Sequence, residues 1–285
     1  MNDRVTVDIQ GGVADVRLVR ADKMNALDNA MFEALIQTGE RLKGEPGLRA
    51  VVLSGEGRAF CAGLDMGNFS QMASGTRERG QGTTGALVTA NRTPGGSNRA
   101  QHAVMVWREI PVPVIAAVHG VAFGGGFQLA CGPDMRFVAP DTKMSVMEIK
   151  WGLVPDMAGL VLMRQLVRDD IARELTYSGR IFTGEEALQL GFATRVTADP
   201  RAEALAFAKD VAGKNPHGIR AAKRLLNLAA EADQREVLME ESREQTALIG
   251  SPNQVEAVTA NLQKRAPNFA EAEVETPSPV SFGAG

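Results

Sequence analysis

Two carboxylates, Glu148 and Asp156, are the residues best suited to catalysis, and they flank a short apolar turn. Glu148 comes just after a predicted strand, and Asp156 directly follows a proline. A carboxylate can take a proton from one substrate atom, and a carboxylic acid can return a proton at another, so the pair could perform general acid–base chemistry. The alternatives are that Asp156 caps a helix predicted over residues 158–166 and that Glu148 is a surface charge.

Two glycine-containing turns could stabilise a negative charge through backbone N–H groups. The sequence FCAGLD at residues 60–65 follows a short apolar run, and GGG at residues 124–126 precedes a helix predicted to start near Phe127. Glycine lets a ligand approach the backbone closely, and a helix N-terminus offers free N–H donors. Two donors that converge on one point would form an oxyanion hole, although a triple glycine also serves simple tight packing.

Few other side chains suggest chemistry. Cys61 lies beside the first turn without a histidine in its motif, so a buried thiol is its favoured role. His119 is predicted to be structural, while His102 and His217 have no evident partners, so we predict no metal site. Residues 120–126 lack the G-x-G-x-x-G spacing of a dinucleotide-binding turn, and we set that function aside.

The elements that must position these groups follow a layered α/β pattern. Alternating and short apolar runs indicate strands, some of them buried on both faces, and apolar residues at helical spacing indicate helices. Strand, helix and buried strand in succession are typical of a layered α/β fold. Strands are predicted over residues 5–9, 13–18, 50–55, 114–118, 135–138 and 143–146, and helices over residues 28–43 and 101–109.

Strand patterns end near residue 200, and the rest of the chain is predicted to be helical. We therefore expect an α/β core over residues 1–200, a helical module over residues 201–266 and a flexible tail over residues 267–285. Residues 70–99 are rich in glycine, serine and threonine, and are predicted to be a long surface segment. This segment is either a lid over a site or an inert insertion. Helices of the module are predicted at 202–212, 217–231, 234–249 and 252–264.

The composition is that of an ordinary globular protein. The chain has 285 residues, a formal net charge of −3, 44% hydrophobic residues and 23% charged residues. A slightly acidic chain offers no broad cationic surface, so nucleic acid is not an expected partner. Two cysteines, the absence of an apolar leader and the interruption of the most apolar stretch, residues 112–130, favour a cytoplasmic location without a membrane span.

In these segments the chain closely resembles the enoyl-CoA hydratase/isomerase, or crotonase, family, over roughly residues 5–269. The resemblance implies repeated ββα units in two roughly perpendicular sheets, with C-terminal helices that build homotrimers and commonly hexamers. It implies an acyl-CoA substrate and no cofactor, because coenzyme A is part of that substrate. The matching motifs are RADKMNAL at 20–27, AFCAGLD at 59–65, VHGVAFGGG at 118–126 and TGEEA at 183–187 with Gly191.

The resemblance also assigns residues to the binding of the thioester. The backbone N–H groups of Leu64 and Gly125 stand where the family holds the thioester oxygen, and each such donor contributes roughly 3 kcal/mol to an enolate-like state. Lys264 matches a lysine that reaches the CoA phosphates from a neighbouring subunit. The rest of CoA would lie along two segments that include Lys23, Met24, Ala26, Ala62, Asp65 and Met66.

The carboxylate pattern favours one branch of the family. Hydratases use two glutamates, and Gln128 stands at the position of one of them while Glu148 matches the other. Glutamine cannot accept a proton at useful pH. Dienoyl-CoA isomerases carry a glutamate and an aspartate eight residues apart, as Glu148 and Asp156 are, with an aspartate at the position of Gln128. We predict double-bond isomerisation, with Glu148 as principal base, Asp156 as acid or second base, and Gln128 orienting substrate or water.

Four other functions are alternatives to this one. The first is a 2-enoyl-CoA hydratase that adds water mainly through Glu148, and the second is a CoA-binding protein with weak catalysis, which Gln128 would favour. The third, an aromatic acyl-CoA dehalogenase, would use Asp156 as a nucleophile but pairs it with a tryptophan where Glu148 stands. An RNA-binding homologue would need a lysine-rich helix, and the basic residues here are scattered among acids.

Overall fold

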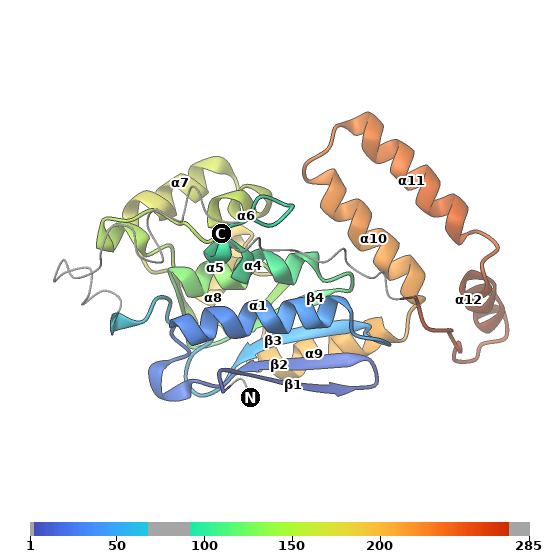
Figure 1. Cartoon of the computed structure of the whole chain (residues 1–285), viewed down its shortest axis with the longest axis horizontal. Coiled ribbons are helices and arrows are strands. Elements are labelled where there is room, and N and C mark those ends of the chain that lie inside the picture. Colours follow the sequence, from blue (N-terminus) through green and yellow to red (C-terminus); the bar gives the residue numbers. More distant parts are fainter. Residues whose placement is uncertain (1–2, 68–91, 274–285) are drawn as a thin grey trace.

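The computed structural model describes residues 3–67 and 92–273, and a six-stranded sheet forms its centre (Figure 1). The strand order is β1-β2-β3-β4-β6-β8. The pair β1 and β2 is antiparallel and turns at Gly11 and Gly12, which both have positive φ, whereas the other neighbours are parallel. The bounds are β1 Val5–Gln10, β2 Val13–Leu18, β3 Ala50–Gly55, β4 Val114–Val118, β6 Met135–Val138 and β8 Arg195–Val196.

Helices cover both faces of this sheet, which explains why its central strands are apolar throughout. In β3, Val51 and Leu53 belong to the large core shared with α1 and α4, whereas Ala50 and Val52 belong to a smaller core shared with α9. Alternation along a strand sends successive side chains to opposite faces. Helix α9 thus packs on the sheet, although the sequence pattern grouped residues 201–212 with the helical module. The helices are α1 Asn29–Lys43, α4 Arg99–Glu109 and α9 Pro200–Ala212.

A second, two-stranded sheet lies directly after β4. The chain passes through His119 and Gly120 into β5 (Val121–Phe123), which pairs in parallel with β7 (Lys143–Ser145). Gly120 has φ of 64°, and a Cβ atom there would overlap the carbonyl oxygen of Arg58, so only glycine allows this turn. A bridge between Cys61 and Ala122 adds the first glycine-containing turn to this small sheet.

Short helices fill the space around the second sheet. Helix α5 runs through the core, and its residues from Gly126 to Cys131 are all buried. The ring of Phe127 packs edge-on against Phe182 and Phe192, which fixes α5 within the apolar interior. The elements are α5 Gly125–Cys131, the 3-10 helix η2 Glu148–Trp151, α6 Gly159–Leu166, α7 Asp169–Ser178 and α8 Gly184–Leu190.

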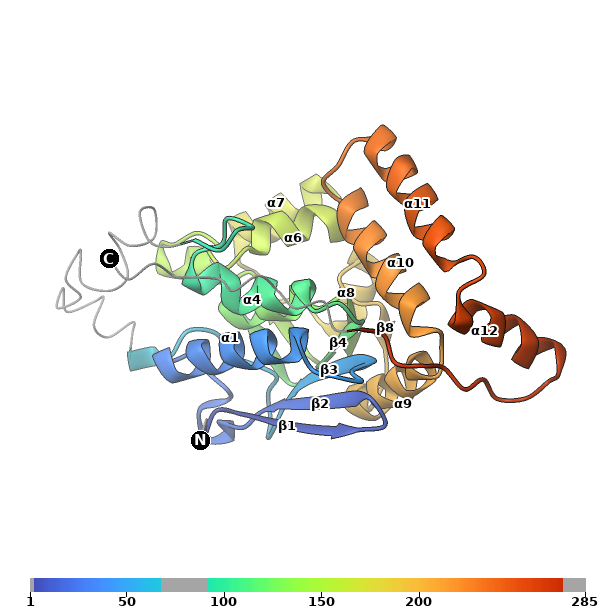
Figure 2. The same ribbon diagram turned by 45° about the vertical axis from the view of Figure 1, so that its right-hand side comes forward.

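The last three helices project from the core (Figures 1 and 2). Helix α10 is attached through Lys223, whose Nζ lies 2.7 Å from Asp134 Oδ2 and 2.9 Å from the carbonyl oxygen of Val112. Helix α11 packs against α10 and buries none of its residues. No helix in the described part of the chain is long and apolar enough to span a membrane. The bounds are α10 Pro216–Ala229, α11 Gln234–Leu248 and α12 Pro252–Leu262.

Two segments predicted from composition fall mostly outside the described residues. Of the surface segment predicted at 70–99, residues 70–91 are not described, and helix α4 begins at Arg99 with Asn98 as its N-cap. Of the tail predicted at 267–285, residues 267–273 are described and return to the core, where Glu271 forms an ion pair with Arg49 at 3.0 Å.

Candidate active site

The N–H group of Leu64 points away from its neighbouring strand. Leu27 donates to the carbonyl of Gly63 over 2.8 Å, and Asp65 donates to the carbonyl of Leu27 over 3.1 Å. In a parallel bridge these bonds use the residues on either side of Leu64, so the N–H of Leu64 itself faces the opposite side. It makes no hydrogen bond with any described residue, and Leu64 is half-buried rather than enclosed. This donor is available to a ligand.

Gly125 provides a second free donor from the neighbouring turn. It is the first residue of α5, so its N–H has no acceptor within the helix, and no other described residue accepts from it. The two turns are in backbone contact, because a Cβ atom on Gly63 would lie 2.5 Å from the carbonyl oxygen of Phe123 and 3.5 Å from the nitrogen of Gly125. The fold therefore brings together the two turns predicted to form an oxyanion hole.

The carboxylate of Glu148 lies against the same turn. Glu148 opens η2 and is 8% exposed, and a Cβ atom on Gly124 would lie 3.4 Å from its Oε1. Oε1 accepts a hydrogen bond of 2.5 Å from Nε2 of Gln128, whereas the buried Oε2 has no partner among the described residues. Burial raises the pKa of Glu148 and the nearby charge of Asp156 adds to this, while the hydrogen bond from Gln128 opposes it.

The side chain of Gln128 binds three groups of the protein itself. Its side chain is fully buried on α5, and its Oε1 accepts hydrogen bonds from the N–H groups of Met157 at 2.8 Å and Gly159 at 3.0 Å. Its amide nitrogen donates to Glu148. These contacts use the oxygen of Gln128 and one of the two hydrogens of its amide nitrogen, so that Gln128 orients substrate or water stays a prediction.

Asp156 is exposed on the loop between η2 and α6. It does not cap α6, because that helix begins at Gly159 and has Ala158 as its N-cap, in a left-handed conformation and without a side-chain hydrogen bond. The N-cap alternative is thus wrong. The residue after Asp156 is anchored to Gln128, and the sulfur of Met157 packs where a Cβ atom on Gly125 would be.

The residues predicted to contact CoA fall into two groups. The segments around Met24 and Ala62 lie side by side, since the N–H of Ala62 donates to the carbonyl of Met24 over 2.9 Å. Lys264 is exposed after α12, and both views place α12 on the opposite side of the molecule from the segment that ends at Gly67 (Figures 1 and 2). In the first group, Lys23 and Met66 are exposed, Met24, Ala62 and Asp65 are half-buried, and Ala26 is buried.

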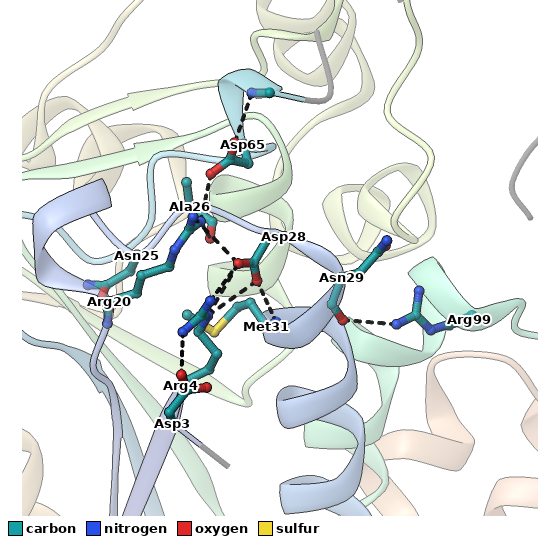
Figure 3. A network of polar contacts seen from close by, with 11 residues as sticks. Asp3, Arg4, Arg20, Asn25, Ala26, Asp28, Asn29, Met31, Asp65 and Arg99 are labelled. Atoms are coloured by element: carbon teal, nitrogen blue, oxygen red, sulfur yellow. Dashed lines mark hydrogen bonds and ion pairs between the residues drawn. The ribbon is translucent and has the colours of Figure 1, made fainter. Parts of the chain in front are cut away.

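An arginine that the sequence analysis gave no role supports the first turn (Figure 3). Nη1 of Arg20 donates to Asp65 Oδ2 over 2.7 Å and to the carbonyl of Ala26 over 3.0 Å, and Asp28 lies beside it. Hydrogen bonding from the N–H of Gly67, together with Arg20, holds the pKa of Asp65 below its ordinary value. The carboxylate of Asp65 is thus committed to the protein's own backbone and guanidinium.

Asn25 was also missed, although it stands in the motif that carried the resemblance. It has φ of 55°, its Oδ1 accepts from the N–H of Arg20, and its amide nitrogen donates to the carbonyls of Glu56 and Ala59. Asparagine tolerates this left-handed conformation better than most residues. The Arg-to-Asn spacing in the 20–27 segment was the available indication that both side chains brace the turn.

One cluster with metal-ligand side chains was invisible in the sequence. Glu40, His102 and Glu109 place one ligand atom each within 4.8 Å of one another. The ammonium group of Lys43 lies 2.8 Å from Glu40 Oε1 and 2.5 Å from Glu109 Oε2, so a cation of the protein already pairs with both carboxylates. The cluster joins α1 to α4 and is structural.

Comparison with known proteins agrees with this geometry. The model of the family described as Enoyl-CoA hydratase/isomerase matches residues 8–272. The chain belongs to the enoyl-CoA hydratase/isomerase family. This confirms the resemblance drawn from the motifs, and it makes the protein an enzyme of the crotonase superfamily, whose members act on acyl-CoA substrates.

Relatives with both hydratase and isomerase names resemble this crotonase. A Mycobacterium leprae protein named "Probable enoyl-CoA hydratase echA6" is 32% identical over 261 residues, which cover 90% of this chain and 96% of that protein. The Mus musculus protein named "Delta(3,5)-Delta(2,4)-dienoyl-CoA isomerase, mitochondrial" is 28% identical over 260 residues, with 90% and 78% covered. The crystal structure of a Mycobacterium smegmatis enoyl-CoA hydratase superimposes with a TM-score of 0.80, 27% identity and coverage of 93% and 98%.

Proposed function

We propose that this crotonase moves a double bond along an unsaturated acyl-CoA by proton transfer through Glu148 and Asp156. The observation that carries this proposal is the set of contacts that Glu148, Gln128 and Asp156 make. Glu148 keeps one unpartnered carboxylate oxygen, Gln128 is committed to holding other groups, and Asp156 is the next carboxylate. Water addition by two glutamates would need a second carboxylate at position 128, where an amide stands.

The proposed reaction starts at the thioester. Its carbonyl oxygen would accept hydrogen bonds from the N–H groups of Leu64 and Gly125, which stabilise the negative charge of an enolate. Glu148 Oε2 takes a proton from a carbon that this carbonyl acidifies, and the C–H electron pair enters the conjugated system. Asp156 returns a proton at a remote carbon, and the double bonds shift between the two positions. Glu148 then releases its proton, and Asp156, which is exposed, is reloaded from water.

The raised pKa of Glu148 fits a base in this reaction. Burial makes the carboxylate more basic than an exposed glutamate, and proton abstraction becomes easier as the pKa of the base approaches the working pH. No cofactor is required in this scheme, because coenzyme A enters as part of the substrate. It would lie along Lys23, Met24, Ala26, Ala62, Asp65 and Met66.

A second candidate is water addition to a 2-enoyl-CoA with Glu148 as the single catalytic carboxylate. The hydratase name of the M. leprae relative favours it. The two candidates differ in what the second group must do, since hydration requires a bound water and isomerisation requires a proton donor at a remote carbon. The buried amide of Gln128 offers the water no acceptor, which is why we prefer isomerisation.

The deciding experiment is a parallel assay of a 3,5-dienoyl-CoA and a 2-trans-enoyl-CoA, followed by ultraviolet absorbance of the conjugated system. We expect faster turnover of the dienoyl ester, and loss of this activity by 10²-fold or more, in order of magnitude, in both Glu148→Gln and Asp156→Asn. Faster hydration than isomerisation, or full isomerase activity in Asp156→Asn, would contradict the proposal. Binding of the ester without turnover of either substrate would instead favour a CoA-binding protein.

We also propose that the helical module assembles homotrimers or hexamers. In support, α11 buries no residue, and apolar side chains remain exposed on the module, namely Leu226, Leu238, Met239, Ile249, Val255, Val258 and Leu262. Assembly would also place Lys264 against CoA bound to a neighbouring copy. Light scattering after size exclusion tests the mass, and a monomer at micromolar concentration would contradict this assembly. The cytoplasmic location stays a prediction from the sequence.

A further inference from the structure

The amide of Gln128 is held in one orientation by its surroundings. Two N–H donors, those of Met157 and Gly159, converge on its Oε1 at 2.8 and 3.0 Å, and two donors can face only an oxygen. The amide nitrogen must therefore face Glu148, where it lies 2.5 Å from Oε1. Because Gln128 is fully buried, no water competes for these bonds.

This orientation makes the two oxygens of Glu148 unequal. Oε1 already accepts the hydrogen of an amide, so the carboxyl group is protonated more readily on Oε2, whose lone pairs are both free of described partners. Oε2 is buried and has no partner among the described residues. A buried polar atom without a partner is costly unless a ligand satisfies it. Oε2 is therefore the carboxylate atom of Glu148 that remains available to a substrate.

The same amide fixes the loop that carries the second carboxylate. Its bond to the N–H of Met157 anchors the residue directly after Asp156, and its contact with Gly159 is so tight that a Cβ atom there would lie 2.7 Å from Oε1 of Gln128. The intervening Ala158 is held with φ of 66°. The side chain of Gln128 thus binds Glu148 directly and holds Asp156 in place through the backbone of Met157.

We propose that Gln128 is a positioning residue that aligns both carboxylates of the proton shuttle and restricts proton transfer at Glu148 to Oε2. This inference rests on the proposed proton transfer through Glu148. It gives the amide of Gln128 a function of its own, whereas the comparison with hydratases shows only that a glutamate is missing at this position. In each cycle Oε2 gains the proton taken from the substrate carbon and later releases it, while Oε1 remains bound to the amide throughout.

A carboxylate in place of the amide could not play this role. A glutamate introduced by Gln128→Glu could still accept from Met157 and Gly159, but its other oxygen would face Glu148 Oε1 at about the present separation. Two carboxylate oxygens this close must share a proton, which raises the pH at which the pair loses it. The titratable described groups that face Glu148 are Asp156 on the loop and the buried thiol of Cys131 at the end of α5.

The test is the pH profile of kcat/KM for three variants, measured on whichever of the two acyl-CoA substrates the wild type turns over faster. We expect Gln128→Glu and Gln128→Met to shift the acid limb upward, which lowers kcat/KM by about tenfold for a shift of about one pH unit when it is measured below the wild-type limb. In Gln128→Met the shift arises because the hydrogen bond that favours the ionised form is lost. The control Gln101→Glu, at the capping box of α4, keeps the wild-type profile.

The exchanged double variant Gln128→Glu with Glu148→Gln separates position from charge. It restores one amide beside one carboxylate, so its thermal stability should exceed that of Gln128→Glu alone. Its activity should stay as low as that of Glu148→Gln, because both oxygens of the relocated carboxylate are occupied. Recovery of more than about a tenth of wild-type activity, or profiles of Gln128→Glu and Gln128→Met that superimpose on the wild type, would overturn the assignment.

The outcome is independent of the identity of the reaction. If the wild type proves to be a hydratase, the proposed isomerisation fails, yet the pH profiles on the enoyl ester still measure whether Gln128 governs Glu148. If Gln128→Glu does not fold, Gln128→Met supplies the same comparison. Circular dichroism establishes which variants are folded, and only the pH profiles of folded variants are compared.

Discussion

Arg20 and Asp65 form an ion pair of 2.7 Å that joins the 20–27 turn to the residue directly after Leu64. Because Asp65 also donates its N–H to Leu27, the backbone on the far side of Leu64 is held by both a main-chain bond and a side-chain bond. Arg20, more than 40 residues earlier in the chain, thus contacts the residue that follows the Leu64 N–H.

Arg20→Met should weaken catalysis more than binding. The change removes the bonds to Asp65 and Ala26 but leaves Leu64 in place, so we expect kcat to fall by roughly tenfold, a fraction of the loss that follows removal of an entire oxyanion donor. Steady-state kinetics measure kcat and KM separately. Arg180→Met, which breaks an ion pair with Glu174 at the end of α7, is the matched control. A wild-type kcat in Arg20→Met would show that the backbone bonds alone suffice.

Glu148→Gln should stabilise the protein at high pH relative to low pH. The folded-state pKa of Glu148 is raised by burial, so its favourable contribution is complete below the ordinary value of 4.5 and is lost as the pH rises through the raised pKa. Glutamine does not ionise, so the unfolding free energy of the variant minus that of the wild type should increase between pH 4 and pH 8. Urea denaturation at both pH values measures this, with Asp141→Asn as control, because Asp141 is exposed. A difference that stays constant between pH 4 and pH 8 would count against a raised pKa.

Gly63→Ala should damage the oxyanion hole by steric overlap. Gly63 has φ of 88°, and its Cβ would lie 2.5 Å from the carbonyl oxygen of Phe123, so the two turns must separate. We expect kcat/KM to fall by about 10²-fold, as when one oxyanion donor is removed. Gly250→Ala is the matched control, because Gly250 has φ of 77° with nothing within 4 Å of the added atom. Equal losses in both variants would attribute the effect to backbone strain alone.

Both thiols should resist alkylation in the native protein. Cys61 and Cys131 are buried, and desolvation raises the pKa of each thiol to about 12, so almost no thiolate exists at neutral pH. Labelling with iodoacetamide at pH 8, with and without urea, checks this. We expect iodoacetamide to label the thiols only in urea, where the protein is unfolded. Without urea, treatment with iodoacetamide should leave the enzymatic activity unchanged. Rapid native labelling would mean that the core around the first turn opens.

Features encoded by neighbouring residues were predictable from the sequence. The strands at 50–55 and 114–118 are apolar throughout because each is covered on both faces, and the structure confirms them. The two glycine-containing turns could be located because their residues are adjacent in the chain, whereas the choice of Leu64 and Gly125 within them came from the family resemblance. Whether these donors bind a thioester stays a prediction.

Features that depend on packing were not predictable. Gln128 finds its acceptors and donors 20 to 31 residues away, and no local spacing indicates which way its amide points. The same holds for Lys43 and Glu109, which are 66 residues apart. The alternative that Asp156 is an N-cap was wrong because Ala158, in a left-handed conformation, is the N-cap of α6. Helix α9 resembled its successors in sequence pattern, yet it packs against the sheet.

The two free donors at Leu64 and Gly125 belong to the main chain, whereas the groups around them are side chains. Replacement of Leu64 by another residue leaves its N–H in place, and only the glycines beside it resist change. Gln128, Glu148 and Asp156 can each be exchanged by a single substitution without rebuilding the turns. Such a scaffold can pass its charge-stabilising unit unchanged to descendants whose proton chemistry diverges, and this chain carries one combination of three exchangeable groups.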